Sequence, residues 1–384
     1  MVEKLPKDLQ GFYKGLPYHI LPSAYAHWKP PHKAPWTIGF LDGPLNNPYT
    51  VVLLKDMDFW AKKLEAAGIL KNFIAEAAPD YTVGPQLQQF NSLIEQKVNL
   101  IIVLPNSAPP LVPVIERAYK ADIPTVTIAG PVDGTPDVVN WTHNPFLNGA
   151  RPTAYIAKNY MHGKGNILMM EGVPTAPTAI ATFAGAEAAL KECPGIKIIN
   201  PTPLISQYSN PVAKSVTLQF LATYQGTING VMDGGIVAPG IISAFQQLGK
   251  TVPPMTNIGA IDGALEYFKT HEASGAGGAG TGSGNYEYNR IAMDIAIRIL
   301  EGKGPKLNNI DSEAYLITKS NLSFMLKYNT KNMTLNNYNV GEVPPFSLET
   351  SSQLNGYFNS PGVTAPAGLD SGTPSGFSSI FGIT

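Results

Sequence analysis

The ten residues GAGGAGTGSG, from Gly275 to Gly284, are the stretch of the chain that most resembles a phosphate-binding loop. Their first six satisfy G-x-G-x-x-G, a pattern that holds the pyrophosphate of a dinucleotide when a strand precedes it and a helix follows. No strand-like apolar run comes immediately before Gly275, and no acidic residue follows on a second strand at the distance that reads a ribose. We therefore interpret the run as a cleft-lining loop whose glycines allow close backbone approach or hinge bending. A dehydrogenase is the enzymatic alternative.

Other reactive residue types give little support for catalysis. The sequence has no G-x-S-x-G elbow, no H-E-x-x-H motif and no Walker motif. Cys193 is the single cysteine, so neither an internal disulfide nor a cysteine-rich metal site is expected. Three histidines near the N-terminus fit no common metal motif: His19, His27 and His32. His143 has two open interpretations, a side chain in a cleft or a satisfied capping residue. We expect a protein that is not an enzyme and that uses no metal or cofactor.

Composition limits the classes of protein that the chain can belong to. Its 384 residues suffice for two lobes, because single hydrophobic cores stop growing at roughly 250–300 residues. It is 44% hydrophobic and 14% charged, with a net charge of −1. This balance disfavours both a disordered chain and a nucleic-acid binder, which carries a basic surface. No apolar run reaches the roughly 18 residues of a membrane span.

Short apolar runs alternate with longer helical patterns over most of the chain, and this alternation predicts parallel sheets with right-handed crossovers. The predicted strands are 37–41, 69–77, 100–104, 125–128, 166–170, 196–199, 230–232 and 257–261. The predicted helices are 48–67, 86–96, 111–121, a segment ending at 160, 179–191, 212–224 and 237–248. Residues 291–300 alternate like a strand, but their length and alanines favour a buried helix. Two such runs predict two doubly wound α/β lobes.

Four stretches of the chain together resemble the ribose-type sugar-binding proteins of the periplasm. PLNNPYTVVLLKDM (44–57) is similar to that family's first strand exit, an N-N-P-aromatic turn followed by a helix. The other three are residues 86–130, IGAIDG (258–263) and NRIAMDIAIRILEGKGP (289–305). The resemblance covers about residues 36–330. It implies the type I periplasmic binding protein fold, in which a hinge of several chain crossings joins two lobes and the ligand binds between them.

The resemblance also implies a division of the chain. We expect a first lobe from residues 36–141 plus 271–304 and a second lobe from 142–270 plus 305–335. Residues 1–35 are rich in proline and are expected to form an extended arm lying on the body. They offer no helix-turn-helix, which disfavours a transcriptional repressor. Residues 336–384 form a C-terminal extension that we expect to dock in part.

The candidate ligand-binding residues follow predicted strands, where open α/β sheets bind ligands. Carried over from the resemblance and from these positions, they are Asn46, Asn47, Tyr49, Asn106, Ser107, Asp133, Ile180, Tyr208, Asp233, Asp262 and Ser283. Asn47 has a second interpretation as a helix N-cap, and Asp262 as an ordinary turn residue. The relatives carry an acidic residue, an arginine and an asparagine where this chain has Ser107, Ile180 or Thr182, and Gly234. These departures predict a wider and less polar cleft.

The function implied by the resemblance is capture of a small molecule, a sugar or polyol, and its delivery to the permease of an ABC importer. Two alternatives stay open. One is a larger, less hydroxylated solute such as an aromatic or polycyclic acid or a nucleoside, and the other is a ligand sensor for a membrane receptor. The first residues, MVEKLPKDLQ, lack a signal sequence. The protein is therefore cytosolic or has lost its signal peptide, and the resemblance implies a periplasmic or membrane-anchored extracellular monomer without nucleic acid.

Overall fold

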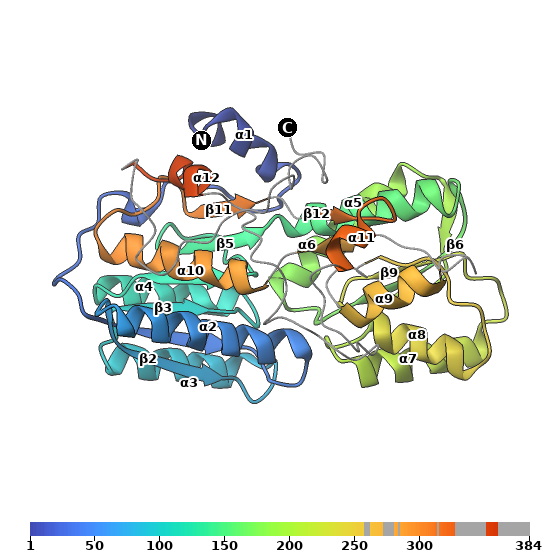
Figure 1. The fold of residues 1–384 in the computed structure, drawn as a ribbon, viewed down its shortest axis with the longest axis horizontal. Helices are drawn as coiled ribbons and strands as arrows, with labels where there is room; N and C mark the ends of the chain where they lie inside the picture. The colour runs from blue at the N-terminus through green and yellow to red at the C-terminus, as the bar shows by residue number, and fades with distance from the viewer. Residues whose placement is uncertain (257–261, 272–279, 283–284, 313–314, 327–350, 360–384) are drawn as a thin grey trace.

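The computed structural model describes residues 1–256, 262–271, 280–282, 285–312, 315–326 and 351–359 (Figure 1). Its largest sheet has six parallel strands in the order β11-β5-β4-β3-β1-β2. The strands are β1 (Trp36–Asp42), β2 (Leu70–Ala77), β3 (Leu100–Val103), β4 (Thr125–Ile128), β5 (Val139–His143) and β11 (Asn309–Ser312). This sheet and the helices on it form the first lobe, on the left of Figure 1.

Helices cover both faces of this sheet because its strands are apolar on both sides. On one face, Leu100 and Ile102 pack with α2 (Pro48–Ala66) and α10 (Asn285–Leu300). On the other, Ile101 and Val103 pack with α3 (Val83–Glu95) and α4 (Val112–Lys120), which follows η4 (Pro109–Leu111). Successive side chains of β3 therefore face opposite sides of the sheet, as the period-two geometry of a β-strand requires. The prediction that 291–300 is helical is confirmed.

The second lobe is built around β6 (Lys164–Glu171), which pairs in parallel with three other strands. These are β7 (Gly195–Ile198), β8 (Leu204–Ile205) and β9 (Gly230–Asp233). The helices of this lobe are α5 (Pro145–Asn159), α6 (Pro177–Lys191), α7 (Asn210–Thr223), α8 (Ala238–Gln247) and α9 (Asp262–His271). The predicted strand 257–261 lies outside the described residues.

Helices α5 and α6 cross with their backbones in contact. A Cβ atom at Gly149 would lie 1.8 Å from the carbonyl oxygen of Thr182, and one at Gly185 would lie 1.9 Å from that of Phe146. Real Cβ atoms do not approach backbone this closely, so only glycine fits at both positions. The crossing therefore fixes the spacing between two helices that begin at the boundary between the lobes.

The described parts of the N-terminal and C-terminal segments pack against the first lobe. The N-terminal segment forms η1 (Val2–Lys4), α1 (Lys7–Gln10), η2 (Gly11–Tyr13) and η3 (Ala24–Ala26), and the C-terminal segment forms α12 (Ser351–Gly356). Leu9, Tyr25, Tyr357 and Phe358 belong to the same core cluster as Trp141 of β5. Figure 1 shows α1 and α12 on the side of the sheet that carries β11. The expectation that both ends dock holds in the described residues, although the arm contains short helices.

One expected boundary differs from the structure. Residues 305–335 were expected in the second lobe, but β11 pairs with β5 in the first sheet, residue for residue from Asn309–Asn140 to Ser312–His143. β12 (Tyr315–Ile317) instead pairs antiparallel with β10 (Gly280–Gly282), and Ile317 packs in the second-lobe core, as does Leu322 of α11 (Leu322–Met325). The last crossing therefore follows Ser312. The sequence pattern did not predict β11 because its side chains are largely polar yet buried.

None of the described helices is long and apolar enough to cross a membrane.

Candidate functional site

A cavity of about 180 Å³ lies between the two lobes, at the ends of the first-sheet strands. Its lining comes from both lobes: Asn47, Tyr49, Thr50, Tyr81, Leu104, Pro105, Asn106, Ala129, Thr142, His143, Pro145, Asn148, Ala176, Thr178, Thr182, Tyr208, Gly234, Ile236 and Tyr288. None of these described lining residues is acidic, lysine or arginine. The cavity wall is therefore made of amides, hydroxyls, aromatic rings and apolar groups.

One part of the wall belongs to the β1–α2 corner, which we define as the lining residues Asn47, Tyr81 and Asn106 together with Asn46 behind them. Asn47 caps α2, because its Oδ1 accepts a hydrogen bond of 3.1 Å from the backbone N–H of Thr50. Its Nδ2 donates to the Tyr81 hydroxyl at 2.8 Å, and that hydroxyl donates to Asn46 Oδ1 at 3.3 Å. Burial raises the pKa of Tyr81 to about 12. Asn47 thus fulfils both interpretations offered by the sequence: it caps the helix and it lines the cavity.

Asn106 completes this corner from the loop after β3. Its backbone N–H donates to Gln86 Oε1 at 3.0 Å, and its Nδ2 donates to the carbonyl of Asp80 at 3.2 Å. The neighbouring Ser107 is buried but does not line the cavity. Asn46 lies outside the lining as well. The N-N-P-aromatic turn therefore reaches the cavity through Asn47 and Tyr49.

A second part of the wall is the β5–α5 corner, which we define as His143, Asn148, Tyr288 and Ser312. His143 ends β5, and its Nδ1 pairs with the Ser312 hydroxyl on β11. Its Nε2 has no hydrogen-bond partner. Burial lowers the pKa of His143 to about 3, so the imidazole is neutral near pH 7. The ring lies 4.2 Å from that of Tyr288, centroid to centroid.

Asn148 stands one turn into α5 and belongs to the same corner. Its Nδ2 donates to the carbonyl of His143 at 2.9 Å, whereas its Oδ1 has no partner. The cap of α5 is Asn144, whose Oδ1 accepts from the Leu147 N–H at 3.0 Å. His143 is therefore not the capping residue, and its side chain lines the cavity. This decides between the two interpretations that the sequence left open.

The second lobe contributes Tyr208 to the lining of the cavity. Its backbone φ is +55°, and its ring lies so close to Gly172 that a Cβ atom there would be 2.2 Å from it. The ring centroids of Tyr208 and Tyr81 are 6.0 Å apart, so two tyrosines from different lobes meet at the cavity. Thr178 of α6 also donates across the lobes, to the carbonyl of Ala129 at 3.1 Å.

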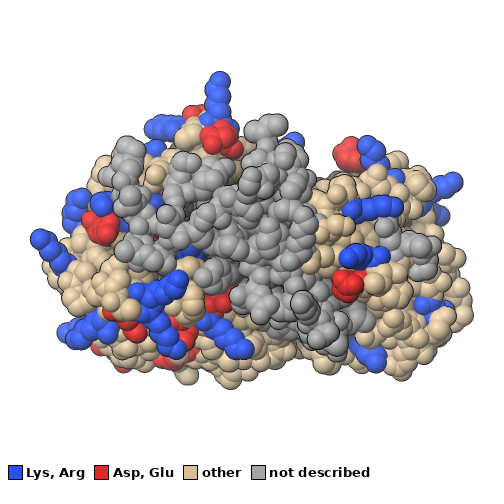
Figure 2. Space-filling model, viewed as in Figure 1, with Lys and Arg blue, Asp and Glu red and all other residues tan. Residues whose placement is uncertain are grey.

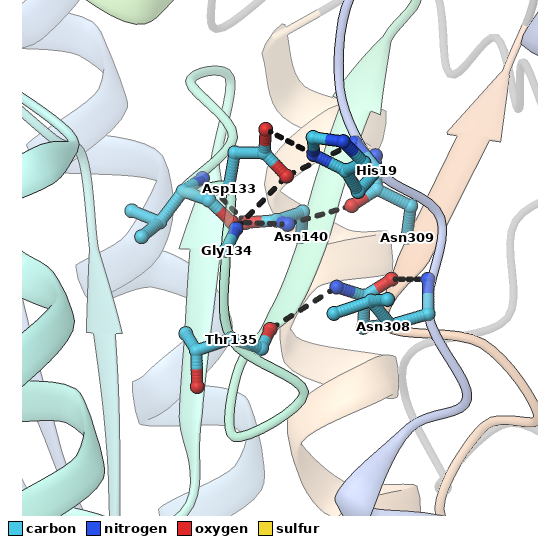
Figure 3. A network of polar contacts seen from close by, with 9 residues as sticks. His19, Asp133, Gly134, Thr135, Asn140, Asn308 and Asn309 are labelled. Carbon is cyan, nitrogen blue, oxygen red and sulfur yellow. Dashed lines mark hydrogen bonds and ion pairs between the residues drawn. The ribbon is translucent and has the colours of Figure 1, made fainter.

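Asp133 was expected to bind ligand, but it holds the N-terminal segment instead (Figure 3). Its Oδ1 accepts from the backbone N–H groups of His19 and Gly134 at 3.0 and 2.8 Å, and its Oδ2 lies 3.0 Å from His19 Nδ1. The loop after β4 turns outward here, toward β11 and the arm. Asp133 does not line the cavity.

Asp233 is also a structural residue rather than part of the cavity lining. Its two carboxyl oxygens accept from the N–H groups of Gly235 and Val237, each at 2.8 Å, and so close the turn between β9 and α8. Burial raises its pKa to about 7. Ile180 is 52% exposed on α6 and is absent from the lining, whereas Thr182 two residues later contributes. The side chain of Asp262 and all of Ser283 lie outside the described residues.

The lining residues that were not predicted include five with polar side chains: Tyr81, Thr142, Asn148, Thr178 and Tyr288. Tyr288 comes from α10 and reaches the cavity only because that helix packs on the first sheet; its hydroxyl donates to the carbonyl of Trp141 and accepts from the N–H of Ala129, each at 2.8 Å. No local pattern marks such residues, because tertiary packing alone brings them to the cavity.

The arrangement of the lobes and the site between them agree with comparison to known proteins. Residues 38–304 match the family described as periplasmic binding protein domain. The chain belongs to this family. Its members are binding proteins rather than enzymes and work outside the cytoplasm. The resemblance and the fold predicted from the sequence are thereby confirmed.

Similar proteins include two characterised relatives. The chain is 27% identical to a xylitol-binding protein of Mycolicibacterium smegmatis over 198 residues, 50% of this chain and 55% of that protein. It is 30% identical to a ribose import binding protein of Bacillus subtilis over 147 residues, 38% of this chain and 45% of that protein. The matched region thus spans about half the length of each relative.

Two solved structures share the fold over most of their length. An ABC transporter solute-binding protein from Thermobispora bispora superposes with a TM-score of 0.68 at 21% identity, covering 77% of this chain and 89% of that one. One from Bacillus halodurans, solved with bound myo-inositol, superposes with a TM-score of 0.66 at 17% identity, covering 77% and 99%. At these identities the likeness concerns the fold alone.

Proposed function

We propose that this protein captures an uncharged, hydroxylated small molecule, a sugar or polyol, in the cavity between its lobes and delivers it to an ABC importer. The observation that carries the proposal is the chemistry of the wall: the described lining contains no acidic or basic side chain, yet it is rich in amides, hydroxyls and rings. A charged ligand would bury its charge against this wall without a counter-ion, which is costly.

Sugars and polyols match such a wall because they carry hydroxyls around an apolar C–H surface. Four tyrosines line the cavity and supply flat apolar faces: Tyr49, Tyr81, Tyr208 and Tyr288. Three asparagines supply amides that both donate and accept: Asn47, Asn106 and Asn148. The absence of a cation from the described lining disfavours aromatic and polycyclic acids.

The relatives support the same ligand class, since one is a xylitol-binding protein, another a ribose import binding protein, and a structural neighbour holds myo-inositol. A ligand that touches both lobes stabilises their closed arrangement, so closure on binding belongs to the proposal. On the face of the molecule drawn in Figure 2, charges of both signs are intermixed over the region of α2 and β2.

A nucleoside is the second candidate, favoured by the number of rings at the cavity. Tyr81 and Tyr208 approach each other from the two lobes, and Gly234 adds backbone without a side chain. A flat, uncharged base would lie against these rings, and its ribose would offer hydroxyls.

Calorimetry tests the proposal directly. The protein, unfolded and refolded to remove co-purified ligand, would be titrated with xylitol, myo-inositol and ribose, beside uridine and benzoate. We expect a polyol or sugar to bind with micromolar or tighter affinity and benzoate not to bind. Binding of uridine alone would select the nucleoside, and binding of benzoate alone would refute an uncharged ligand.

A further inference from the structure

Two buried polar atoms, each on a residue that lines the cavity, have no hydrogen-bond partner among the described residues. They are Nε2 of His143 and Oδ1 of Asn148. Other buried side-chain atoms without partners occur in the described residues, but among these only His143 and Asn148 line the cavity. Native proteins seldom leave buried polar atoms unpaired. Two such atoms on residues that line one cavity therefore point to a partner from outside the chain.

Both side chains are held in place by their other polar atom. The Nδ1 of His143 is bonded to the Ser312 hydroxyl, and the Nδ2 of Asn148 donates to the carbonyl of His143. The imidazole also packs against two rings that contact each other, with its centroid 5.4 Å from that of Trp141 and 4.2 Å from that of Tyr288. Neither residue can turn to pair its free atom within the protein without breaking a hydrogen bond that it already makes.

The chemistry of the two free atoms selects hydroxyl groups. A neutral imidazole has one donor and one acceptor nitrogen, so the role of Nε2 is the opposite of the role that Nδ1 takes with Ser312. Asn148 Oδ1 only accepts. A hydroxyl donates and accepts, so it satisfies Nε2 in either tautomer and also Oδ1. A carboxylate has no proton to give to Asn148, and an ammonium group cannot accept from an imidazole N–H.

We propose that His143 and Asn148 together determine specificity by binding hydroxyl groups of the ligand, and that Ser312 positions the His143 ring. This assignment rests on the proposed function, because it names the residues that recognise the uncharged hydroxylated ligand. Ser312 lies 169 residues further along the chain than His143 and stands opposite it in the strand pair. His143 and Asn148 are therefore supported by β11, the strand that ends at Ser312 just before the last crossing between the lobes.

The test combines protein variants with altered ligands. His143→Phe and Asn148→Ala are compared with the matched controls His27→Phe, in the N-terminal arm, and Asn159→Ala, at the far end of α5. Ribose, xylitol and myo-inositol are the probes, and 2-deoxyribose and 5-deoxyribose each lack one hydroxyl of ribose. We expect each specificity variant to weaken binding at least tenfold and the controls to change it less than twofold, with wild-type thermal unfolding in the controls.

A coupling measurement separates recognition from a merely structural effect. We expect loss of the recognised ribose hydroxyl to weaken binding at least tenfold in the wild type and less than threefold in His143→Phe, because the variant has already lost that contact. Ser312→Ala should shift the ¹⁵N resonances of the His143 ring toward a different tautomer mixture and weaken binding less than His143→Phe does.

The outcomes are distinguishable. If ribose, xylitol or myo-inositol binds the wild type and both specificity variants equally well, the assignment of His143 and Asn148 is wrong while the proposed function stands. The assignment also fails if removal of a ribose hydroxyl weakens binding by the same factor in His143→Phe as in the wild type, for both 2-deoxyribose and 5-deoxyribose. If none of the three probes binds the refolded wild type, the proposed function and this assignment fall together.

Discussion

The two polar corners of the cavity use their hydrogen bonds in opposite ways. In the β1–α2 corner, Asn47 pairs with Tyr81 and with the Thr50 N–H at the start of α2, and Asn106 pairs with the loop before α3. In the β5–α5 corner, each of His143 and Asn148 pairs one polar atom inside the protein and leaves one without a partner. In the first corner both amide atoms of Asn47 are paired within the protein, whereas we propose that the second corner binds a ligand.

This difference suggests a division of roles, in which one corner sets the shape of the cavity and the other recognises the ligand. A closed network fixes the outline of the cavity, and a ligand that uses it must share or displace bonds that are already made. An atom fixed in position and unpaired gains a bond without losing one, and such groups discriminate strongly between ligands with and without the matching hydroxyl. We therefore expect the β1–α2 corner to contribute mainly to stability and the β5–α5 corner mainly to affinity and specificity.

The largest effect is expected at the helix crossing that carries the second corner. Gly149→Ala places a Cβ atom on the Thr182 carbonyl, so α5 must shift away from α6. We expect the free energy of unfolding to fall by about 2–3 kcal/mol, as in overpacked cores, and ligand affinity to fall because Asn148 moves with the helix. Urea unfolding and calorimetry check both.

Gly84→Ala is the matched control for that change. Gly84 is also helical, but a Cβ atom there meets nothing within 4 Å. The substitution should leave stability unchanged or raise it by about 0.5–1 kcal/mol. Equal losses in the two variants would show that the α5–α6 crossing has no special role.

Lowering the pH should destabilise the protein through His143 of the β5–α5 corner and not through the β1–α2 corner. Burial lowers its pKa from 6.5 to about 3, so between these values the unfolded chain binds a proton that the folded chain does not. The contribution of His143 to the free energy of unfolding is complete above pH 6.5 and is lost as the pH falls below that value. At pH 4.5 the loss should be about 3 kcal/mol, and His143→Gln should abolish it.

The control for the pH effect lies in the other corner. The pKa of Tyr81 is raised to about 12 by burial, so this hydroxyl keeps its proton throughout the range and Tyr81→Phe should leave the acid dependence as in the wild type. Urea unfolding at pH 7 and pH 4.5 gives the comparison. An identical pH dependence in the wild type and His143→Gln would contradict the neutral, buried state of His143.

The same contrast explains which parts of the candidate site could be predicted from the sequence. The β1–α2 corner forms within a few residues of one strand exit, so N-N-P-Y predicted both the turn and the helix cap that Asn47 supplies. The β5–α5 corner needs β11 and α10, which come from distant parts of the chain. Asp133 and Asp233 were misjudged for a related reason: a carboxylate after a strand serves a turn or an arm as readily as a ligand, and its direction depends on the loop.

Asn47 offers a smaller effect that sharpens the comparison. Asn47→Ala removes the cap of α2 and should cost about 1 kcal/mol of stability, whereas Asn47→Asp keeps an oxygen for the Thr50 N–H and should cost less. Because both amide atoms of Asn47 are already paired, we expect affinity to fall by less than about 1 kcal/mol in either variant. A larger loss of affinity than of stability would place the β1–α2 corner among the recognition groups.

The smallest effect is expected at Ile180, one of the two residues, with Thr182, that the resemblance sets against an arginine of the ribose-type proteins. Ile180 is 52% exposed and outside the cavity lining, so Ile180→Ala should change both stability and affinity by less than about 0.5 kcal/mol. Thr182, one of the lining residues on the same helix, gives the matched change Thr182→Ala, which should weaken binding more. Calorimetry with the best polyol of the panel measures both. If Ile180→Ala proves the more damaging, then closure of the lobes must bring the start of α6 onto the ligand, and recognition would extend beyond the β5–α5 corner into the second lobe.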